Sequence, residues 1–351
     1  MIYFDNAASA MPRKEAVDAF NAVLAENFSN PAALHKGGIE SEKIITKSRE
    51  AILSHLPKGG RLLFTSGATE SNNLAIMNSV KPRNKNKIVT TAIEHPSVSG
   101  VMDKLSEAYE IVRVLPHEEI AAAVDENTCL VSMTAACGET GFIINTAKIY
   151  AEIKARFPDC IVHVDGVQSF LKLPINDMDG DLISLSSHKI GGIPGVGGLF
   201  VKDTARINPM MFGGGQQKGT RPGTEPAALI AAFGKAQDLG FRIEGRLNER
   251  LVDGLEGLGL KINSRNNIPH IVNFSCGVKS EVMLHFLAEH LVYVSSGSAC
   301  ARGKKSRILP AYAIPDRDID TAIRVSFGWQ NTIEEVDEFL NILEAGLKRW
   351  K

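Results

Sequence analysis

The chain has 351 residues, with 39 lysines and arginines against 40 aspartates and glutamates, so its formal net charge at pH 7 is -1. Hydrophobic residues make up 44% of it and charged residues 23%, which is typical of a globular protein of about two domains. This balance gives no reason to expect nucleic acid or an anionic membrane as a partner, and no apolar run in the sequence is long enough to span a bilayer.

The sequence contains five scattered cysteines and no recognisable signal peptide. No two cysteines have the spacing of a zinc site or of a redox pair, so we expect no metal site and a reducing, cytoplasmic location. The first nine residues, MIYFDNAAS, lack the basic and apolar segments of a secretory signal. The cysteines are Cys129, Cys137, Cys160, Cys276 and Cys300.

The first part of the chain predicts an arm followed by two helices. Residues 1–10 suit a short strand or an extended arm, and the helix that follows has Pro12 near its first turn. After Asn30-Pro31, residues 38–56 form an amphipathic stretch. Its apolar residues recur at roughly helical spacing: Ile44, Ile45, Ile52 and Leu56.

A glycine-bearing turn follows the first strand of the sheet. The strand is expected at 62–65, the turn SGAT occupies 66–69, and a helix is expected from Glu70. Amide groups at the N-terminus of a helix bind phosphate, and Thr69 adds a hydroxyl. The same pattern also suits an ordinary strand–turn–helix connection with a threonine cap.

The next strand ends close to Glu94-His95-Pro96. His95 could lie face-on over the ring of an aromatic cofactor, although a histidine at a strand end is more often a hydrogen-bonded structural residue. Strands alternate with helical segments through this half of the chain, which predicts an α/β domain with a largely parallel sheet. The strands are expected at 62–65, 87–92, 129–134, 161–165, 181–186 and 197–201.

Two neighbouring strands end in residues that suit pyridoxal phosphate. The apolar run IVHVD ends at Asp165, and the run DLISLS ends in Ser186-Ser187-His188-Lys189 before a glycine-rich turn. In enzymes that use this cofactor, a carboxylate pairs with the ring nitrogen and a lysine binds the cofactor covalently. Taken alone, the local pattern around Lys189 is more typical of a solvated loop lysine.

The sequence changes in texture from about residue 245 and predicts a smaller α+β domain. We expect an N-terminal arm over 1–14 that packs with this small domain, a large cofactor-binding domain over 15–244, and the small domain over 245–351. The small domain carries Cys300 ahead of the basic stretch ARGKKSR, a strand with Arg324, and a terminal helix with a capping box.

Together these motifs resemble the cysteine desulfurases of the class V aminotransferase group. They occur in the order of that family and span nearly the whole chain: YFDNAAS, NPAALH, FTSGATESNN, EHPSV, HVDGVQS, SSHKIGGIPGVGGLFV, GGGQQKGTRPGT, SSGSAC and IRVSFG. The resemblance implies a pyridoxal-phosphate enzyme of fold-type I with a mainly parallel seven-stranded sheet. It also implies a homodimer, L-cysteine as the substrate and a possible sulfur-acceptor protein.

The resemblance also implies roles for individual residues. Lys189 holds the cofactor and moves protons, Asp165 keeps the ring nitrogen protonated, and His95 stacks on the ring. Arg324 clamps the carboxylate of the substrate, and Cys300 accepts its sulfur as a persulfide. The remaining contacts implied for cofactor and substrate come from Ala68, Thr69, Gln168, Ser186 and His188, from Thr224 toward the phosphate of the partner subunit, and from Asn6 toward the substrate.

Two departures from the family pattern keep other functions open. Gly138 stands where the family usually has an asparagine, and the segment after Cys300 lacks the usual serine- and proline-rich pattern. The alternatives are a selenocysteine lyase, a cysteine-sulfinate lyase or an aminotransferase of the same fold. A sulfur-relay or scaffold protein without turnover belongs to a different class.

Overall fold

The computed structural model describes residues 1–80, 85–243, 245–296 and 306–350. Contacts divide the chain into two compact units. The large unit comprises residues 11–135 and 145–240, and the small unit comprises residues 1–10, 136–144 and 241–351. The segment 136–144 therefore leaves the large unit and packs with the small one. The division into an arm over 1–14, a large domain over 15–244 and a small domain over 245–351 remains a prediction from the sequence.

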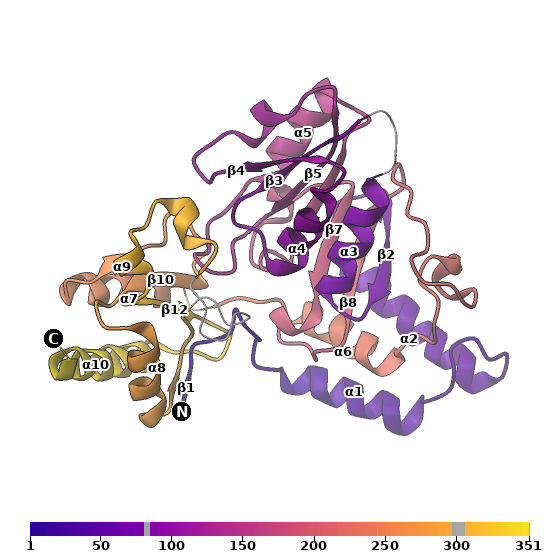
Figure 1. Ribbon diagram of the computed structural model, residues 1–351. Helices are drawn as coiled ribbons and strands as arrows, with labels where there is room; N and C mark the ends of the chain where they lie inside the picture. Colours follow the sequence, from indigo (N-terminus) through magenta and orange to yellow (C-terminus); the bar gives the residue numbers. More distant parts are fainter. Residues whose placement is uncertain (81–84, 244, 297–305, 351) are drawn as a thin grey trace. The chain divides into compact units, whose positions relative to one another are not determined.

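The large unit is built on a seven-stranded sheet with the order β2-β8-β7-β6-β5-β3-β4 (Figure 1). Strands β4, β3, β5, β6 and β7 run parallel, whereas β8 is antiparallel to both β7 and β2. This confirms the predicted α/β class and the mainly parallel sheet. The strands are β2 (Gly60–Thr65), β3 (Lys87–Thr91), β4 (Glu110–Val114), β5 (Thr128–Thr134), β6 (Ile161–Asp165), β7 (Leu182–Ser186) and β8 (Gly197–Lys202).

The burial of each strand explains which strands could be predicted from the sequence. Every residue of β5 and β7 is buried, so these strands are nearly continuous apolar runs, as expected inside a parallel sheet. The edge strand β4, EIVRV, is buried only at Val114. Its charged residues obscured the pattern, and we had not predicted it.

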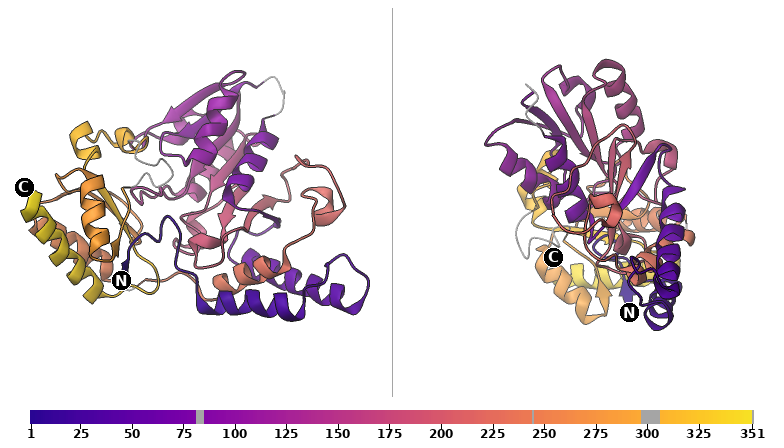
Figure 2. Two further views of the ribbon diagram at one scale, coloured as in Figure 1. Left: turned by 60° about the horizontal axis from the view of Figure 1, so that its bottom comes forward. Right: turned by 90° about the vertical axis from the view of Figure 1, so that its right-hand side faces the viewer.

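Helices cover the sheet and pack with one another. Helix α3 packs against α4 and against strands β6, β7 and β8, while α1 and α2 both pack against α6 (Figures 1 and 2). The helices of the large unit are α1 (Lys14–Glu26), α2 (Lys36–Leu53), α3 (Ala68–Ser79), α4 (Pro96–Leu105), α5 (Thr146–Arg156) and α6 (Ala227–Asp238).

The small unit contains an antiparallel sheet of order β12-β10-β9 and a parallel pair, β1 with β11. Its core includes Phe4, whose ring contacts those of Phe327 and Phe339 edge-on at centroid distances of 5.3 and 5.8 Å. The elements are β1 (Ile2–Tyr3), β9 (Lys261–Ile262), β10 (Ile271–Ser275), β11 (Val292–Tyr293), β12 (Ala322–Ser326), α7 (Leu247–Gly257), α8 (Ser280–Glu289), α9 (Asp316–Ile319) and α10 (Ile333–Trp350).

The terminal helix α10 has the predicted capping box. The Thr332 Oγ1 accepts a bond from the Glu335 amide at 3.4 Å, and the Glu335 carboxylate accepts one from the Thr332 amide at 3.2 Å. Among the described residues, no helix combines the length and the apolar character needed to cross a bilayer.

Candidate active site

A tight turn between β2 and α3 presents the start of a helix. Gly67 precedes α3 with φ of 155°, a conformation that side chains with a Cβ rarely adopt, and it offers no side-chain cap. The helix begins at Ala68, two residues earlier than predicted, so Ala68 and Thr69 form its first turn. A Cβ on Gly197 of β8 would lie only 2.7 Å from the Cα of Gly67. The glycine at 197 therefore lets the turn lie close to the sheet, with its amides suited to an anion.

Asp165 lies at the end of β6 and is only 4% exposed. Its Oδ2 accepts a bond from Asn72 Nδ2 at 2.9 Å, and its Oδ1 accepts one from the Val167 amide at 3.1 Å. Both partners are donors, as an ionised carboxylate requires. This geometry fits a carboxylate that holds a protonated ring nitrogen.

His95 interacts electrostatically with both Asp165 and Lys189, and His188 interacts with Lys189 and His95. His95 caps α4, and its pKa is lowered because surrounding protein displaces water, although the residue as a whole is exposed. The charge of Lys189 lowers this pKa further and that of Asp165 opposes the shift. Burial and the charge of Lys189 lower the pKa of His188 to about 4. Both shifts favour the neutral imidazole.

The other predicted cofactor contacts belong to the same unit. Ser186, 4% exposed, ends β7, directly before the short helix Ser187–Lys189. Gln168 is 8% exposed, and its Oε1 accepts a bond from Lys172 Nζ at 3.1 Å. The turn suited to an anion, the buried carboxylate, the lysine and the imidazole of the exposed His95 together fit pyridoxal phosphate.

The loop that carries Thr224 is fixed to the same turn. The side-chain amide of Gln217 bonds the backbone N–H and C=O of Phe64 in β2 at 2.6 and 2.8 Å. Arg221 forms two bonds to Glu70 at 2.9 and 3.1 Å, and Glu70 accepts the Ser66 amide at 2.7 Å. Thr224 itself is exposed.

Arg324 lies in the small unit and is 4% exposed. Its guanidinium donates to Asp5 Oδ1 at 2.7 Å and to the Gly138 carbonyl at 2.8 Å. Its Nε is buried, and among the described residues it has no partner. A carboxylate could accept from this Nε–H, which fits the predicted clamp.

Asn6, also in the small unit, is 1% exposed and holds the N-terminal arm to the unit. Its Nδ2 donates to the carbonyls of Tyr3 and Ser326 at 3.1 and 3.0 Å, and its Oδ1 accepts from Gln330 at 3.3 Å. These bonds give Asn6 a structural task, and its contact with substrate remains a prediction.

Four of the five cysteines lie within the described residues, and all four are buried. Burial raises the pKa of the Cys160 thiol to about 12 and also raises those of Cys129 and Cys137. The Cys276 thiol donates to the Val278 carbonyl at 3.1 Å. The predicted sulfur acceptor, Cys300, lies outside the described residues.

Glu94 is a buried acid beside Asp165. Its Oε1 accepts bonds from the Thr91 hydroxyl and the Thr134 amide at 2.5 and 2.8 Å, while its Oε2 is buried and has no partner among the described residues. Burial raises its pKa to about 8, and the charge of Asp165 acts in the same direction. Glu94 therefore stays protonated in the folded protein at neutral pH.

This protonation predicts a pH-dependent stability. Between about pH 4.5 and about 8 the unfolded chain loses the Glu94 proton and the folded chain keeps it, so the free energy of unfolding falls by up to about 1.4 kcal/mol per pH unit. Glu94→Gln removes this titration. The variant is expected to gain stability over the unmodified protein as pH rises through this window, as measured by urea unfolding at several pH values. Parallel curves would mean that Glu94 ionises normally.

The sequence analysis did not single out Asn72 or Ser97. Both are buried and both lie within hydrogen-bond distance of predicted site residues. Asn72 follows Thr69 by one helical turn, so a helix that starts at residue 68 predicts that the two side chains lie on the same face. Nothing in the sequence marks Ser97 as a site residue, because its place depends on the packing of α4 against α3.

Comparisons with known proteins identify the family of the chain. Residues 2–339 match the model of the aminotransferase class-V family. A NifS/IcsS protein homolog from Lactobacillus delbrueckii subsp. bulgaricus is 34% identical, covering 97% of this chain and 95% of the relative. Cysteine desulfurase IscS from Clostridium botulinum is 31% identical, with coverages of 99% and 94%.

Solved structures agree as well. A NifS-like protein superposes with a TM-score of 0.90 at 30% identity, covering 99% of both chains. SspA in complex with cysteine gives a TM-score of 0.81 at 27% identity, covering 95% of this chain and 100% of the other. The chain therefore belongs to the aminotransferase class-V family, among relatives named cysteine desulfurases.

Proposed function

We propose that this protein is a pyridoxal-phosphate-dependent cysteine desulfurase that converts L-cysteine to L-alanine and leaves a persulfide on Cys300. The observation that carries the proposal is the grouping of Asp165, His95 and Lys189 in one unit with the helix start at Ala68. The family of the chain and the cysteine desulfurases among its relatives support the choice of reaction.

Each group in the large unit has a task toward the cofactor. Pyridoxal phosphate, when bound, draws electrons away from the α-carbon of an amino acid. Lys189 would attach the cofactor and would move the proton of that carbon on its Nζ, and Asp165 would hold a proton at the ring nitrogen. The first amides of α3, with Thr69, Ser186 and His188, would hold the phosphate. Gln168 and His95 would hold the ring.

The sulfur step balances on the residues of the chain. The Cys300 thiolate attacks the sulfur of the substrate, a sulfur–sulfur bond forms, and the carbon–sulfur bond breaks with its electron pair left on the β-carbon. A proton completes alanine. Arg324 holds the carboxylate of the substrate through its guanidinium. Elimination supports Cys300, because a thiolate is costly at the four buried cysteines.

Gly138 lies where relatives of this type usually carry an asparagine, and its carbonyl binds Arg324. Gly138→Asn is expected to raise turnover of L-cysteine, because a regained hydrogen bond to a polarised oxygen contributes about 1–3 kcal/mol. Steady-state kinetics would measure the effect, with Gly138→Ala as the control that adds a Cβ and no amide. Equal rates in Gly138→Asn and Gly138→Ala would mean that the asparagine supplies nothing here.

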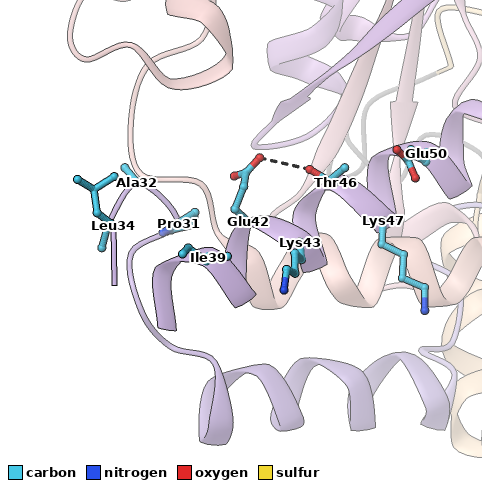
Figure 3. A pocket seen from close by; sticks show the side chains of 10 residues that line it. Pro31, Ala32, Leu34, Ile39, Glu42, Lys43, Thr46, Lys47 and Glu50 are labelled. Atoms are coloured by element: carbon cyan, nitrogen blue, oxygen red, sulfur yellow. Dashed lines mark hydrogen bonds between the residues drawn. The ribbon is translucent and has the colours of Figure 1, made fainter. Parts of the chain in front are cut away.

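We further propose that the protein is a homodimer. Apolar side chains lie exposed on one part of the large unit: Phe28 is 79% and Leu34 96% exposed. A pocket between residues 31–34 and α2 is lined by Leu34, Ile39 and the charged face of the helix (Figure 3). A second copy that covers this surface would bury it, as patches of this kind usually require.

The dimer predicts a change in sedimentation. Leu34→Asp is expected to shift the protein toward monomer, since it places a charge in the covered surface. Ile175→Asp, which alters a half-exposed apolar residue elsewhere on the same unit, is the control. Sedimentation velocity would report both, and a native protein that is already monomeric would contradict the proposal. Transfer of the persulfide to an acceptor protein and a cytoplasmic location remain predictions from the sequence.

The function is tested by supplying L-cysteine and a reductant to the purified protein. Sulfide and alanine are expected in equal amounts. Pyruvate with sulfide, or a keto acid formed without sulfide, would point to a different lyase or to an aminotransferase, and cofactor binding without any product would point to a protein without turnover.

A further inference from the structure

Two buried side chains, Asn72 and Ser97, join His95 to Asp165 within the large unit. Asn72 Nδ2 lies 2.9 Å from Asp165 Oδ2 and 2.8 Å from Ser97 Oγ. Ser97 Oγ in turn lies 2.8 Å from His95 Nδ1. Asn72 is fully buried and Ser97 is 8% exposed, so water does not compete freely for these bonds.

The direction of each hydrogen bond follows from chemistry. An ionised carboxylate only accepts, so Asn72 uses its amide nitrogen toward Asp165, and the second hydrogen of that nitrogen goes to Ser97 Oγ. The Ser97 hydroxyl then has its own hydrogen left for His95 Nδ1. The backbone amide of Ser97 donates to the same Nδ1 at 3.1 Å. Two donors thus meet at Nδ1, which can only be the unprotonated nitrogen.

We propose that Asn72 and Ser97 are positioning residues that hold His95 as the neutral tautomer with its proton on Nε2. A proton on Nδ1 would face two donors, so both the other tautomer and the imidazolium are disfavoured. The inference rests on the proposed function only for the task of His95 beside the cofactor. In that task, the fixed tautomer places a proton at Nε2 and none at Nδ1.

Charged groups near His95 act on its protonation in opposite directions. Asp165 lies at the end of β6, and Lys189 and His188 follow β7. Lys189 disfavours the imidazolium and Asp165 favours it. Burial of Asn72 has a price: its Oδ1 is buried and has no partner among the described residues. The two hydrogen bonds that the Asn72 amide donates offset the cost of this unpartnered oxygen, so we infer that the side chain serves to make them.

Nitrogen NMR of the histidine-labelled holoenzyme tests the proposal without any turnover. The chain has nine histidines, and His95→Gln assigns the His95 signals by their loss. In the unmodified protein Nδ1 should resonate as an unprotonated nitrogen and Nε2 as a protonated one. A His95 ring protonated on Nδ1 would overturn the proposal.

Variants separate positioning from a merely structural role. Ser97→Ala removes one donor to Nδ1, so we expect a mixture of tautomers and a rise in the His95 pKa of roughly one pH unit. Ser97→Thr keeps the hydroxyl and should restore the original signals. Asn72→Leu releases the Ser97 hydroxyl to rotate and should change His95 in the same direction as Ser97→Ala.

The matched controls are Ser99→Ala on the same helix and Asn73→Ala beside Asn72. The side-chain amide of Asn73 donates to the Thr69 carbonyl at 2.8 Å. Both variants should leave His95 unchanged. Identical His95 signals in Ser97→Ala and the unmodified protein would overturn the proposal. If the unmodified protein showed the expected His95 tautomer but produced no sulfide from L-cysteine, the proposed function would be contradicted and this inference would stand.

Discussion

Lys189→Ala is expected to abolish covalent attachment of pyridoxal phosphate and to lower sulfide production from L-cysteine by on the order of 10³-fold, the scale of losing a positioned general base. Lys189 is half-buried at the end of the helix Ser187–Lys189, close enough to His95 and His188 for its charge to act on both. The other side chains proposed to hold the cofactor remain, so non-covalent binding should persist.

Borohydride reduction followed by peptide mapping measures the attachment directly. In the unmodified protein the label should be found on Lys189, and in the variant on no lysine. Lys58→Ala, an exposed lysine of the same unit, is the matched control and should keep the label on Lys189. A label on another lysine of the unmodified protein would show that the site has been placed wrongly.

Cys300→Ala is expected to keep the cofactor and to bind L-cysteine with the same change in absorbance, but to lose sulfide release by on the order of 10³-fold or more, as when an attacking nucleophile is removed. The basic side chains of Arg302, Lys304 and Lys305 follow Cys300 in the sequence and would favour its thiolate. Of the five thiols, Cys300 should be the one that an alkylating reagent labels rapidly in the native protein.

Cys137→Ala is the matched control for Cys300. Cys137 is fully buried, burial raises its pKa, and its thiol lies against Thr140 and Tyr312. Its replacement is expected to reduce stability by about 1 kcal/mol through the lost packing and to leave most of the sulfide production in place. A persulfide trapped on Cys137, together with full activity of Cys300→Ala, would refute the assignment.

The sequence was sufficient wherever the information is local. Asp165 and Lys189 each follow an apolar run that can only be an interior strand of a parallel sheet, so their meeting at one edge could be predicted. The antiparallel β8 brings Gly197 against Gly67, and only the register of paired strands reveals this contact.

Contacts between distant segments could not be predicted. The bond between Arg324 and Asp5 joins residues 319 positions apart, and the bond between Asn72 and Asp165 spans 93 positions. No periodicity marks such pairs, because a side chain on a buried helix face looks like any other core residue until its partner is in place. The edge strand β4 was not predicted for a different reason. Most of it is not buried, so it can carry charged residues, and these hide the strand pattern.

The hydrogen bonds between Gln217 and Phe64 also hinder aggregation of the protein through strand β2. Strand β2 ends the large sheet, and its outward backbone groups are a template on which a foreign strand could assemble. The side-chain amide of Gln217 occupies the backbone N–H and C=O of Phe64, close to the end of β2. A foreign strand therefore cannot pair with this part of β2. Gln217→Ala should therefore make concentrated protein prone to form β-rich aggregates, which thioflavin fluorescence would detect.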